Sequence, residues 1–353
     1  MKIERIGQPQ LVMSNRGSKH CYFGWPTVAR LQNGKLAVAA SGFRLAHICP
    51  FGKTVVCYSE DEGESYTAPA PVIDTVLDDR DGGILAFGEK NVIVTSFNNA
   101  VAFQRRNGSG GAYRDAYLDQ ITPEQEDAAL GSTYRISRDG GVTFGPVLRS
   151  PVTSPHGPAV LKNGEVLWVG RTFDPMNAQN QPVVQAWQIR EDGSMQLRGM
   201  VPPILRDGRA LFACEPHVYE TQSGTLLCHI RDNDYFTTYQ TKSRDGGRTW
   251  TQPHQLLPDR GGAPAHIMCH SSGVLISAYG YREQPYGIRL MFSTDQGESW
   301  ETGHVRYENT VSGDLGYPST VELADGSLLT VFYAKQDQNG PAEIWQQRWK
   351  FAE

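Results

Sequence analysis

The sequence contains no long apolar run. No segment of its 353 residues approaches the roughly 20 apolar residues that a membrane-spanning helix needs. Residues 1–7 also lack the apolar stretch that marks a signal peptide. From these absences we expect no membrane partner and a cytoplasmic location, or secretion if a leader has been removed.

An excess of basic residues and closely spaced cysteines are also missing. The formal net charge is −5, which gives no reason to expect a nucleic acid as partner. No two of the six cysteines have C-x-x-C spacing, so neither a zinc knuckle nor a redox pair is indicated. Four lie in apolar or strand-like runs, which is typical of buried free thiols: Cys57, Cys214, Cys228 and Cys269.

Glycine and proline, by contrast, are plentiful. The 37 glycines and 21 prolines favour many short strands joined by turns. Apolar residues make up 39% of the chain, which is enough to fill a core. Because no linker interrupts the sequence, we expect one domain over residues 1–353.

A short motif, S-x-D-x-G-x-[ST]-aromatic, occurs four times, at residues 59–66, 137–144, 243–250 and 293–300. Its Ser and Asp can bond nearby backbone N–H groups, and its Gly supplies a conformation that other residues resist. Four copies indicate a repeated supersecondary unit. The motifs resemble the Asp-box of the sialidase superfamily, in which each box lies on the outer hairpin of a propeller blade.

A second repeat combines a strand, a Gly-containing turn and a strongly apolar strand, a strong hairpin signal. Its copies begin at Trp25, Asp81, His156, Glu215, Pro264 and Tyr317. Six copies predict an all-β, six-bladed β-propeller with no helix of normal length. Residues 108–111 and 122–127 look like an insertion in the second blade, and residues 343–350 are expected to pair with residues 2–13 and close the ring.

Several polar residues share one position of the repeat. Trp25, Asp81, Glu215 and Tyr317 fall at equivalent places on the inner strands, and His156, His217 and His266 fall within a residue or two of that level. Since inner strands of a propeller surround one axis, we expect all seven side chains to line one pocket. The histidines come from separate blades without metal-ligand spacing, so we expect no metal and no cofactor.

A second set of residues, all cations, follows the apolar second strands: Arg44, Arg171, Arg231, Arg282 and Lys335. Guanidinium groups bind carboxylates through two parallel hydrogen bonds, so this set suits an acidic ligand. The alternative is that some of them pair with acidic residues of the chain itself, namely Asp78, Asp79, Asp81, Asp232 or Asp234.

The resemblance to sialidases extends over almost the whole chain and implies roles for particular residues. Those enzymes use a Tyr nucleophile activated by a Glu, an Arg triad for the substrate carboxylate and an Asp acid/base. Glu215 looks like the activating Glu and Tyr317 like the nucleophile. Arg231 and Arg282 resemble the second and third Arg of the triad.

The first blade departs from the sialidase pattern. The Arg-Ile-Pro motif of the family is here Gly24-Trp25-Pro26, so the first triad Arg is missing. Residues 44–49, where the acid/base Asp is expected, contain His47 but no carboxylate. The late Glu that supports the first Arg is also absent, with Lys335 nearby.

The function expected from this pattern is that of an exo-acting glycoside hydrolase for a terminal acidic sugar, such as a sialic or related acid. Tyr317 and Glu215 would form the nucleophilic pair, and His47 or Asp81 would donate the proton. Binding would fall to Arg231 and Arg282, with Arg44 in place of the missing Arg. Further substrate contacts are expected from Arg171, Trp25, His156, His217 and His266.

Three alternatives remain open. Asp81 and Glu215 could act as an acid and nucleophile pair, as in the propeller arabinanases. A uronate polysaccharide lyase could use Tyr and His as base and acid. The propeller could also bind a glycan without cleaving it. The sequence does not predict the sugar, the linkage or the oligomeric state.

Overall fold

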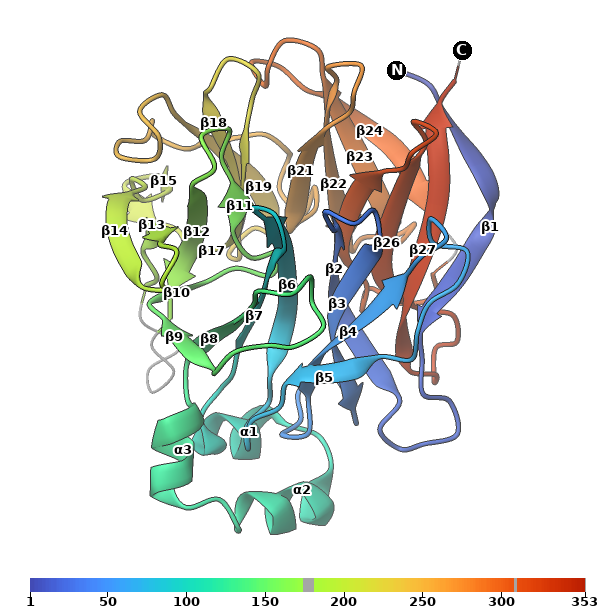
Figure 1. Cartoon of the computed structure of the whole chain (residues 1–353), viewed down its shortest axis with the longest axis vertical. Coiled ribbons are helices and arrows are strands. Elements are labelled where there is room, and N and C mark those ends of the chain that lie inside the picture. The colour runs from blue at the N-terminus through green and yellow to red at the C-terminus, as the bar shows by residue number, and fades with distance from the viewer. Residues whose placement is uncertain (174–180, 308–309, 353) are drawn as a thin grey trace.

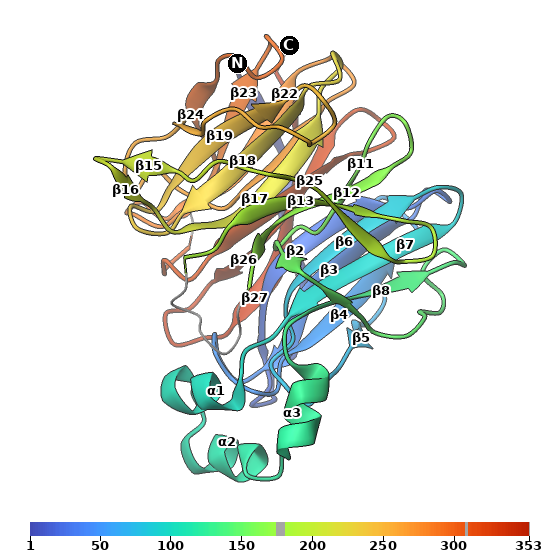
Figure 2. The same ribbon diagram turned by 90° about the vertical axis from the view of Figure 1, so that its left-hand side faces the viewer.

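The computed structural model describes residues 1–173, 181–307 and 310–352. Six antiparallel sheets stand around a common axis and form a six-bladed β-propeller, as predicted (Figures 1 and 2). Each inner strand contacts the inner strand of a neighbouring blade, as β2 does with β6 and β25. Apolar side chains fill the spaces between neighbouring sheets, for example Val28, Val38 and Leu329 between the first and sixth blades.

The first three blades are built from consecutive strands. Blade 1 contains β2 (Tyr22–Arg30), β3 (Leu36–Arg44), β4 (Lys53–Ser59) and β5 (Ala70–Ile73). Blade 2 contains β6 (Arg80–Phe87), β7 (Asn91–Phe97), β8 (Ser132–Ser137) and β9 (Leu148–Ser150). Blade 3 has a divided inner strand, β10 (Val152–Thr153) and β11 (Ala159–Val160), followed by β12 (Val166–Thr172), β13 (Val184–Ile189) and β14 (Met195–Met200).

The remaining blades follow the same plan. The short hairpin of β15 (Leu205–Arg206) and β16 (Arg209–Ala210) precedes blade 4, which contains β17 (Ala213–Glu220), β18 (Leu226–Asp232), β19 (Thr237–Ser243) and β20 (His254–Gln255). Blade 5 contains β21 (Ala265–Cys269), β22 (Leu275–Tyr281), β23 (Gly287–Ser293) and β24 (Glu301–Tyr307). Blade 6 contains β25 (Gly316–Glu322), β26 (Leu328–Lys335), β27 (Ala342–Phe351) and β1 (Ile3–Met13).

The ring closes in the sixth blade, where the two ends of the chain pair. Strand β1 runs antiparallel to β27, with Ile3 opposite Phe351 and Gln10 opposite Gln346. This pairing covers the outer edge of β27, which would otherwise expose unpaired backbone groups. The predicted closure of the propeller is therefore confirmed.

The four Asp-boxes adopt one geometry. In each, the Ser Oγ accepts a hydrogen bond from the Gly N–H, at 2.8, 2.8, 2.9 and 2.8 Å along the chain. The Asp Oδ1 accepts another from the backbone N–H of the Ser or Thr four residues later, at 2.9 Å in all four boxes. Each box follows the third strand of its blade, so the motif holds the turn into the outermost strand.

The insertion in the second blade is helical, which the sequence reasoning did not predict. It lies between β7 and β8 and forms α1 (Val101–Asn107), α2 (Gly111–Leu118) and α3 (Pro123–Ala129). Both views place the three helices together at one end of the molecule, away from the two chain ends (Figures 1 and 2). A hydrogen bond of 2.8 Å from Ser109 N to Ile48 O joins the insertion to the loop after β3. Within the described residues, no helix combines the length and apolarity needed to cross a bilayer.

Candidate active site

The inner strands carry an unusual backbone conformation at one repeated position. Trp25, Asp81, Glu215 and Tyr317 have φ values of 56°, 52°, 51° and 50°. Positive φ is uncommon for residues other than Gly, and each of these residues lies at a shift in the register of its strand. The repeated strain marks the four positions as equivalent, and strained positions of this kind cluster at functional sites.

Three of these positions come from alternate blades. Asp81 lies in blade 2, Glu215 in blade 4 and Tyr317 in blade 6. Their side chains are close enough that the charge of Glu215 raises the pKa of both Asp81 and Tyr317. The axis therefore collects two carboxyl groups and a phenol from opposite sides of the ring.

Tyr317 and Glu215 form a direct hydrogen-bonded pair. The Tyr317 Oη donates to Glu215 Oε1 at 2.5 Å. Arg231 Nη1 donates to Glu215 Oε2 at 2.8 Å and lies 3.4 Å from Tyr317 Oη. A guanidinium, a carboxylate and a phenol thus meet at one point.

The surroundings set the protonation of this pair. Burial favours the neutral form of Glu215, but Arg231, the hydrogen bond from Tyr317 and the charge of Arg282 together hold its pKa below the ordinary value. Burial, and then the nearby Glu215, raise the pKa of Tyr317 well above its ordinary value. At neutral pH the pair is therefore a carboxylate beside a protonated phenol, which suits proton transfer from Tyr317 to Glu215.

The guanidinium groups of Arg231 and Arg282 both lie near the Phe236 ring, at 4.7 and 5.2 Å from its centroid, and the charge of Arg231 acts on the pKa of Arg282. Arg231 is already engaged, since its Nη2 donates to Asn233 Oδ1 at 2.8 Å and its Nη1 to Glu215. Arg282 donates to Leu315 O at 3.1 Å. No carboxylate among the described residues pairs with Arg282, so it can receive one from a ligand.

Asp81 is a second titratable group at the axis. Burial, opposed by the charge of Arg80 and supported by that of Glu215, raises its pKa to about 7. Only 7% of the residue is exposed, and its carboxyl group makes no hydrogen bond with the residues that the structure describes. Arg171 also acts on the pKa of Asp81, and its guanidinium lies 4.8 Å from the Phe173 ring.

Trp25 is buried, with 1% of its surface exposed. Its ring packs 6.4 Å from that of Tyr317 and carries the guanidinium groups of Arg80 and Arg44 at 4.3 and 4.8 Å. The predicted substrate contact of Trp25 is therefore wrong. The indole instead lies among the side chains around it and packs against the ring of Tyr317.

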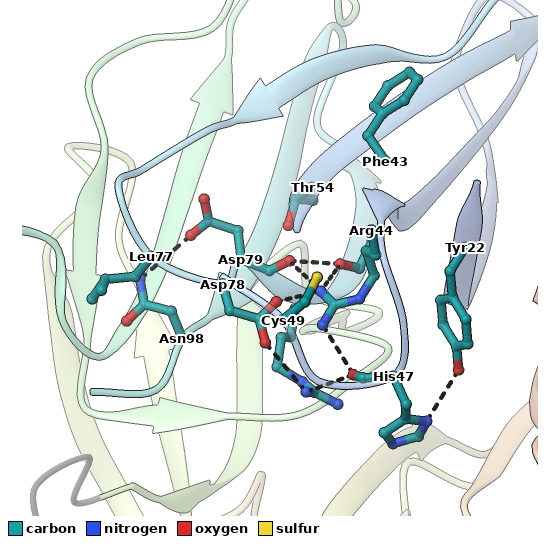
Figure 3. A network of polar contacts seen from close by, with 12 residues as sticks. Tyr22, Phe43, Arg44, His47, Cys49, Thr54, Leu77, Asp78, Asp79 and Asn98 are labelled. Atoms are coloured by element: carbon teal, nitrogen blue, oxygen red, sulfur yellow. Dashed lines mark hydrogen bonds and ion pairs between the residues drawn. The ribbon is translucent and has the colours of Figure 1, made fainter. Parts of the chain in front are cut away.

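Arg44 does not face the pocket, contrary to its predicted role. It forms an ion pair with Asp78, and both side chains are completely buried. It also donates to Ser41 Oγ at 2.8 Å and to His47 O at 3.0 Å (Figure 3). Arg44 thus pairs with an acidic residue of the chain itself, which was the alternative to ligand binding. Its contacts hold the loop after β3 and do not face a ligand.

The three axial histidines lie beyond the strained ring, against the expectation that they line the same pocket. Their rings contact one another at centroid distances of 4.4 to 5.5 Å. His217 Nδ1 accepts from Ile267 N at 3.0 Å, and His266 Nδ1 from Thr320 N at 3.4 Å. Each bond links one blade to the next, as Ser319 Oγ does by accepting from Val28 N at 3.1 Å.

The cavity beside these histidines contains none of the four strained residues. All three histidines, His156, His217 and His266, border this space of about 240 Å³. Its other walls come from the later parts of the inner strands, including Val28 and Thr320. No metal-binding group of three or more His, Cys, Asp or Glu occurs in the described part of the chain. The histidines thus close the axis and join blades.

Sequence reasoning missed Asp314, which joins His47 to the pocket. Asp314 Oδ1 lies 3.1 Å from His47 Nδ1 and accepts from Tyr22 Oη at 2.9 Å and from Tyr333 Oη at 3.2 Å. Lys335 Nζ lies 3.9 Å from its other oxygen. Asp314 belongs to a loop outside the repeats, so its only signal in the sequence is its place three residues before Tyr317.

The pocket therefore contains two linked networks. Arg282 Nη2 donates to Tyr333 Oη at 3.3 Å and so connects the Asp314 network to the arginine pair. Tyr22 Oη and His47 Nδ1 lie 3.0 Å apart, and a dashed line marks this contact in Figure 3. One network contains a phenol, a carboxylate and two guanidinium groups, and the other contains an imidazole, a group that can exchange a proton near neutral pH.

Comparison with solved structures gives propellers of the same form. The chain superposes on a protein of unknown function from Dyadobacter fermentans DSM 18053 with a TM-score of 0.79 and 19% identity, covering 99% of both chains. For the Hadza microbial sialidase Hz136 the TM-score is 0.67 at 15% identity, with 97% of this chain and 68% of that chain covered. For the NanB sialidase of Streptococcus pneumoniae the TM-score is 0.68 at 11% identity, with 97% of this chain and 70% of that chain covered.

At these identities the likeness establishes the fold alone. The comparison with curated proteins gives no match. Residues 120–330, more than half of the chain, match the family model of the BNR repeat-like domain. The chain therefore belongs to the BNR repeat-like domain family, and its six-bladed propeller has the fold of the two sialidases above.

Proposed function

We propose that this protein is an exo-acting glycoside hydrolase that removes a terminal sugar bearing a carboxylate, such as a sialic or related acid. The observation that carries the proposal is the 2.5 Å hydrogen bond between Tyr317 and Glu215 beside Arg231 and Arg282. It joins a nucleophile, its base and a cationic site in one pocket.

A phenol is a suitable nucleophile for such a sugar. The approach of a carboxylate nucleophile to an anomeric carbon that itself bears a carboxylate is opposed by charge repulsion, whereas a neutral phenol is not repelled. Tyr317 Oη attacks that carbon while its proton passes to Glu215, and the bond to the leaving group breaks. Water then cleaves the bond to Tyr317, and Glu215 returns the proton, so the configuration is retained.

The carboxylate of the sugar is expected to bind between Arg282 and Arg231. Arg282 lacks a carboxylate partner among the described residues, and Arg231 lies near the same Phe236 ring, close enough for its charge to act on Arg282. Two guanidinium groups at one site can hold a carboxylate through several charge-assisted hydrogen bonds. The proton for the leaving group comes from His47 or Asp81.

A uronate polysaccharide lyase is the second candidate. The observation that favours it is the 3.0 Å contact between Tyr22 Oη and His47 Nδ1, because Tyr and His can serve as acid and base in β-elimination. A lyase leaves an unsaturated uronate that absorbs in the ultraviolet, which a hydrolase does not produce.

The test is a screen of aryl glycosides of sialic, ketodeoxynononic and uronic acids, with a uronate polymer followed in the ultraviolet. On the substrate that is cleaved, Tyr317→Phe should lower kcat by at least about 1000-fold, because it removes the attacking oxygen and little else. The matched control is Tyr58→Phe, which removes a phenol that donates to Gly141 O at 2.7 Å outside the pocket.

Each other outcome rejects the proposal in a different way. Full activity of Tyr317→Phe excludes the phenol as nucleophile and favours the pair of Asp81 and Glu215. An ultraviolet-absorbing product from the unmodified protein favours the lyase. Binding of a glycan without turnover shows a non-catalytic propeller.

A further inference from the structure

His47 and Asp314 form a pair whose bonding fixes the orientation of the imidazole. The His47 Nδ1 lies 3.1 Å from Asp314 Oδ1 and 3.0 Å from Tyr22 Oη. Tyr22 donates its own proton to Asp314, at 2.9 and 3.1 Å from the two oxygens. The Nδ1 atom must therefore carry a hydrogen, which it directs between the carboxylate and the phenol oxygen.

The other nitrogen of this ring is available. His47 Nε2 makes no hydrogen bond with the described residues, and 43% of the His47 side chain is exposed. The ring packs on Trp25 at 5.0 Å between centroids, and Tyr317 packs on the same Trp25 at 6.4 Å. One indole thus supports both the imidazole and the phenol, which keeps the two groups at a fixed separation.

Asp314 is firmly held in turn. Besides Tyr22 and His47, it accepts from Tyr333 Oη at 3.2 Å, and Lys335 lies 3.9 Å away. Only 22% of its side chain is exposed. With this many donors around it, Asp314 is placed to orient His47 rather than to react.

We propose that His47 is the general acid and base of the hydrolysis and that Asp314 is its positioning residue. This inference rests on the proposed function and deepens it. It differs from the sialidase pattern, in which a carboxyl group in the first blade has this task. Here an imidazole from the same loop, supported by a carboxylate from the loop before Tyr317, performs it.

The place of His47 favours it over Asp81. A terminal sugar enters with its ring toward the axis, so its leaving group points toward the mouth of the pocket. The side chain of His47, on the loop between β3 and β4, is 43% exposed, whereas Asp81 lies on an inner strand and is 7% exposed. A donor to the leaving group must stand near the mouth, which fits His47.

The proton balance closes over the two steps. In the first step, Tyr317 Oη bonds to the anomeric carbon, the bond to the leaving oxygen breaks, and Nε2–H of His47 protonates that oxygen. In the second step, neutral His47 takes a proton from water, and the water oxygen bonds to the anomeric carbon as the bond to Tyr317 breaks. Glu215 receives the phenol proton first and returns it second.

The charges around His47 predict how the pair responds to pH. Burial lowers the pKa of the imidazole, the hydrogen bond to Asp314 raises it, and Arg80 and Arg44 lower it. Lys335 and the phenols of Tyr22 and Tyr333 influence the imidazole indirectly, because all three contact Asp314. Replacing Asp314 by Asn removes the group that raises the pKa, so the imidazole loses its proton at lower pH.

The first experiment compares His47→Gln with Asp81→Asn on two glycosides of one sugar, an activated 4-nitrophenyl glycoside and a methyl glycoside. His47→Gln should lower kcat/KM at least about 100-fold for the methyl glycoside and less than about 10-fold for the activated one. A leaving group that needs no proton makes the acid dispensable. If only Asp81→Asn shows this difference, the inference is overturned while the proposed function stands.

The second experiment uses Asp314→Asn, with Asp207→Asn on the tip of an exposed hairpin as the matched control. The fall in kcat with rising pH should move to lower pH only in Asp314→Asn. An NMR titration of the His47 imidazole, identified by its loss in His47→Gln, should show the same shift. An unshifted titration overturns the positioning role, whether or not a substrate is found. If the unmodified protein cleaves no glycoside, the donor role falls together with the proposed function.

Discussion

The phenol oxygen of Tyr317 lies 2.5 Å from Oε1 of Glu215, although 102 positions separate the two residues in the chain. They belong to the sixth and fourth blades, and both have a positive φ at the start of an inner strand. The same backbone strain on two sides of the ring therefore turns a carboxylate and a phenol toward each other.

Glu215→Gln tests the chemical part of this relationship. Without the carboxylate, the phenol proton has no acceptor, so kcat should fall at least about 100-fold. Arg231 also loses its charged partner, and both side chains are mostly buried, at 12% and 16% exposed for Arg231 and Glu215. The free energy of unfolding at pH 7 should therefore fall by about 1–3 kcal/mol.

The pH dependence of that stability difference follows from the pKa of Glu215. Because its pKa is lower in the folded state, its stabilising effect is present at neutral pH and is lost as the pH falls through the folded pKa. Denaturant unfolding at several pH values should show the variant and the unmodified protein converging in acid. Glu283→Gln, an exposed partner of Arg260, is the control and should change stability by less than about 0.5 kcal/mol.

Arg282→Lys tests the binding of the substrate carboxylate. A lysine retains the charge but cannot form two parallel hydrogen bonds with a carboxylate. KM should rise about 10- to 100-fold with a much smaller change in kcat. Steady-state kinetics measure both, and Arg260→Lys on the surface is the control. An unchanged KM would show that the carboxylate binds elsewhere.

Asp81→Asn should stabilise the protein in a pH-dependent manner. Burial raises the pKa of Asp81 to about 7, so the folded state is penalised as the pH rises through the interval between its unfolded and folded pKa values. Asn carries no charge and tolerates the φ of 52°. The gain in unfolding free energy should be about 1–4 kcal/mol at pH 8 and near zero below pH 4. An equal gain at both pH values would contradict the assigned cause.

His217 should prove structural. In His217→Leu the backbone N–H of Ile267 loses its acceptor, which should lower the free energy of unfolding by about 1–3 kcal/mol and leave KM unchanged. In His217→Asn the side-chain oxygen can take the place of Nδ1, so most of the stability should return. Thermal melting measures the stability of both variants, and steady-state kinetics measure their KM. A raised KM with normal stability would instead place His217 in the substrate pocket.

Much of this architecture could be predicted because the blades repeat one pattern, so a feature recognised in one blade locates the equivalent feature in the others. The Gly turns and the Asp-boxes depend on local backbone conformations, so they are visible in the sequence wherever they occur. The equivalence of Asp81, Glu215 and Tyr317 followed from counting back from those turns, and their shared positive φ has the same local origin.

The errors concern contacts that no repeat controls. Arg44 looked like Arg231 and Arg282 in register, yet it pairs with Asp78 because the segment before β6 packs beneath the loop after β3. Asp314 escaped notice because it lies in an irregular loop. The three helices between residues 101 and 129 are only about two turns each, too short for a periodic apolar pattern to emerge.

The pairing of β1 with β27 has a consequence for how this protein is made. Strand β1 is synthesised before all the other strands of the propeller and its partner β27 after all of them, so the sixth sheet stays incomplete until the rest of the propeller has been made. Long-range pairings of this kind slow folding and leave a strand edge exposed to other chains. Tyr317 lies on β25 of that same sheet. The blade that carries the proposed nucleophile is thus the last to be completed, and newly made protein should gain activity and resistance to unfolding in one step.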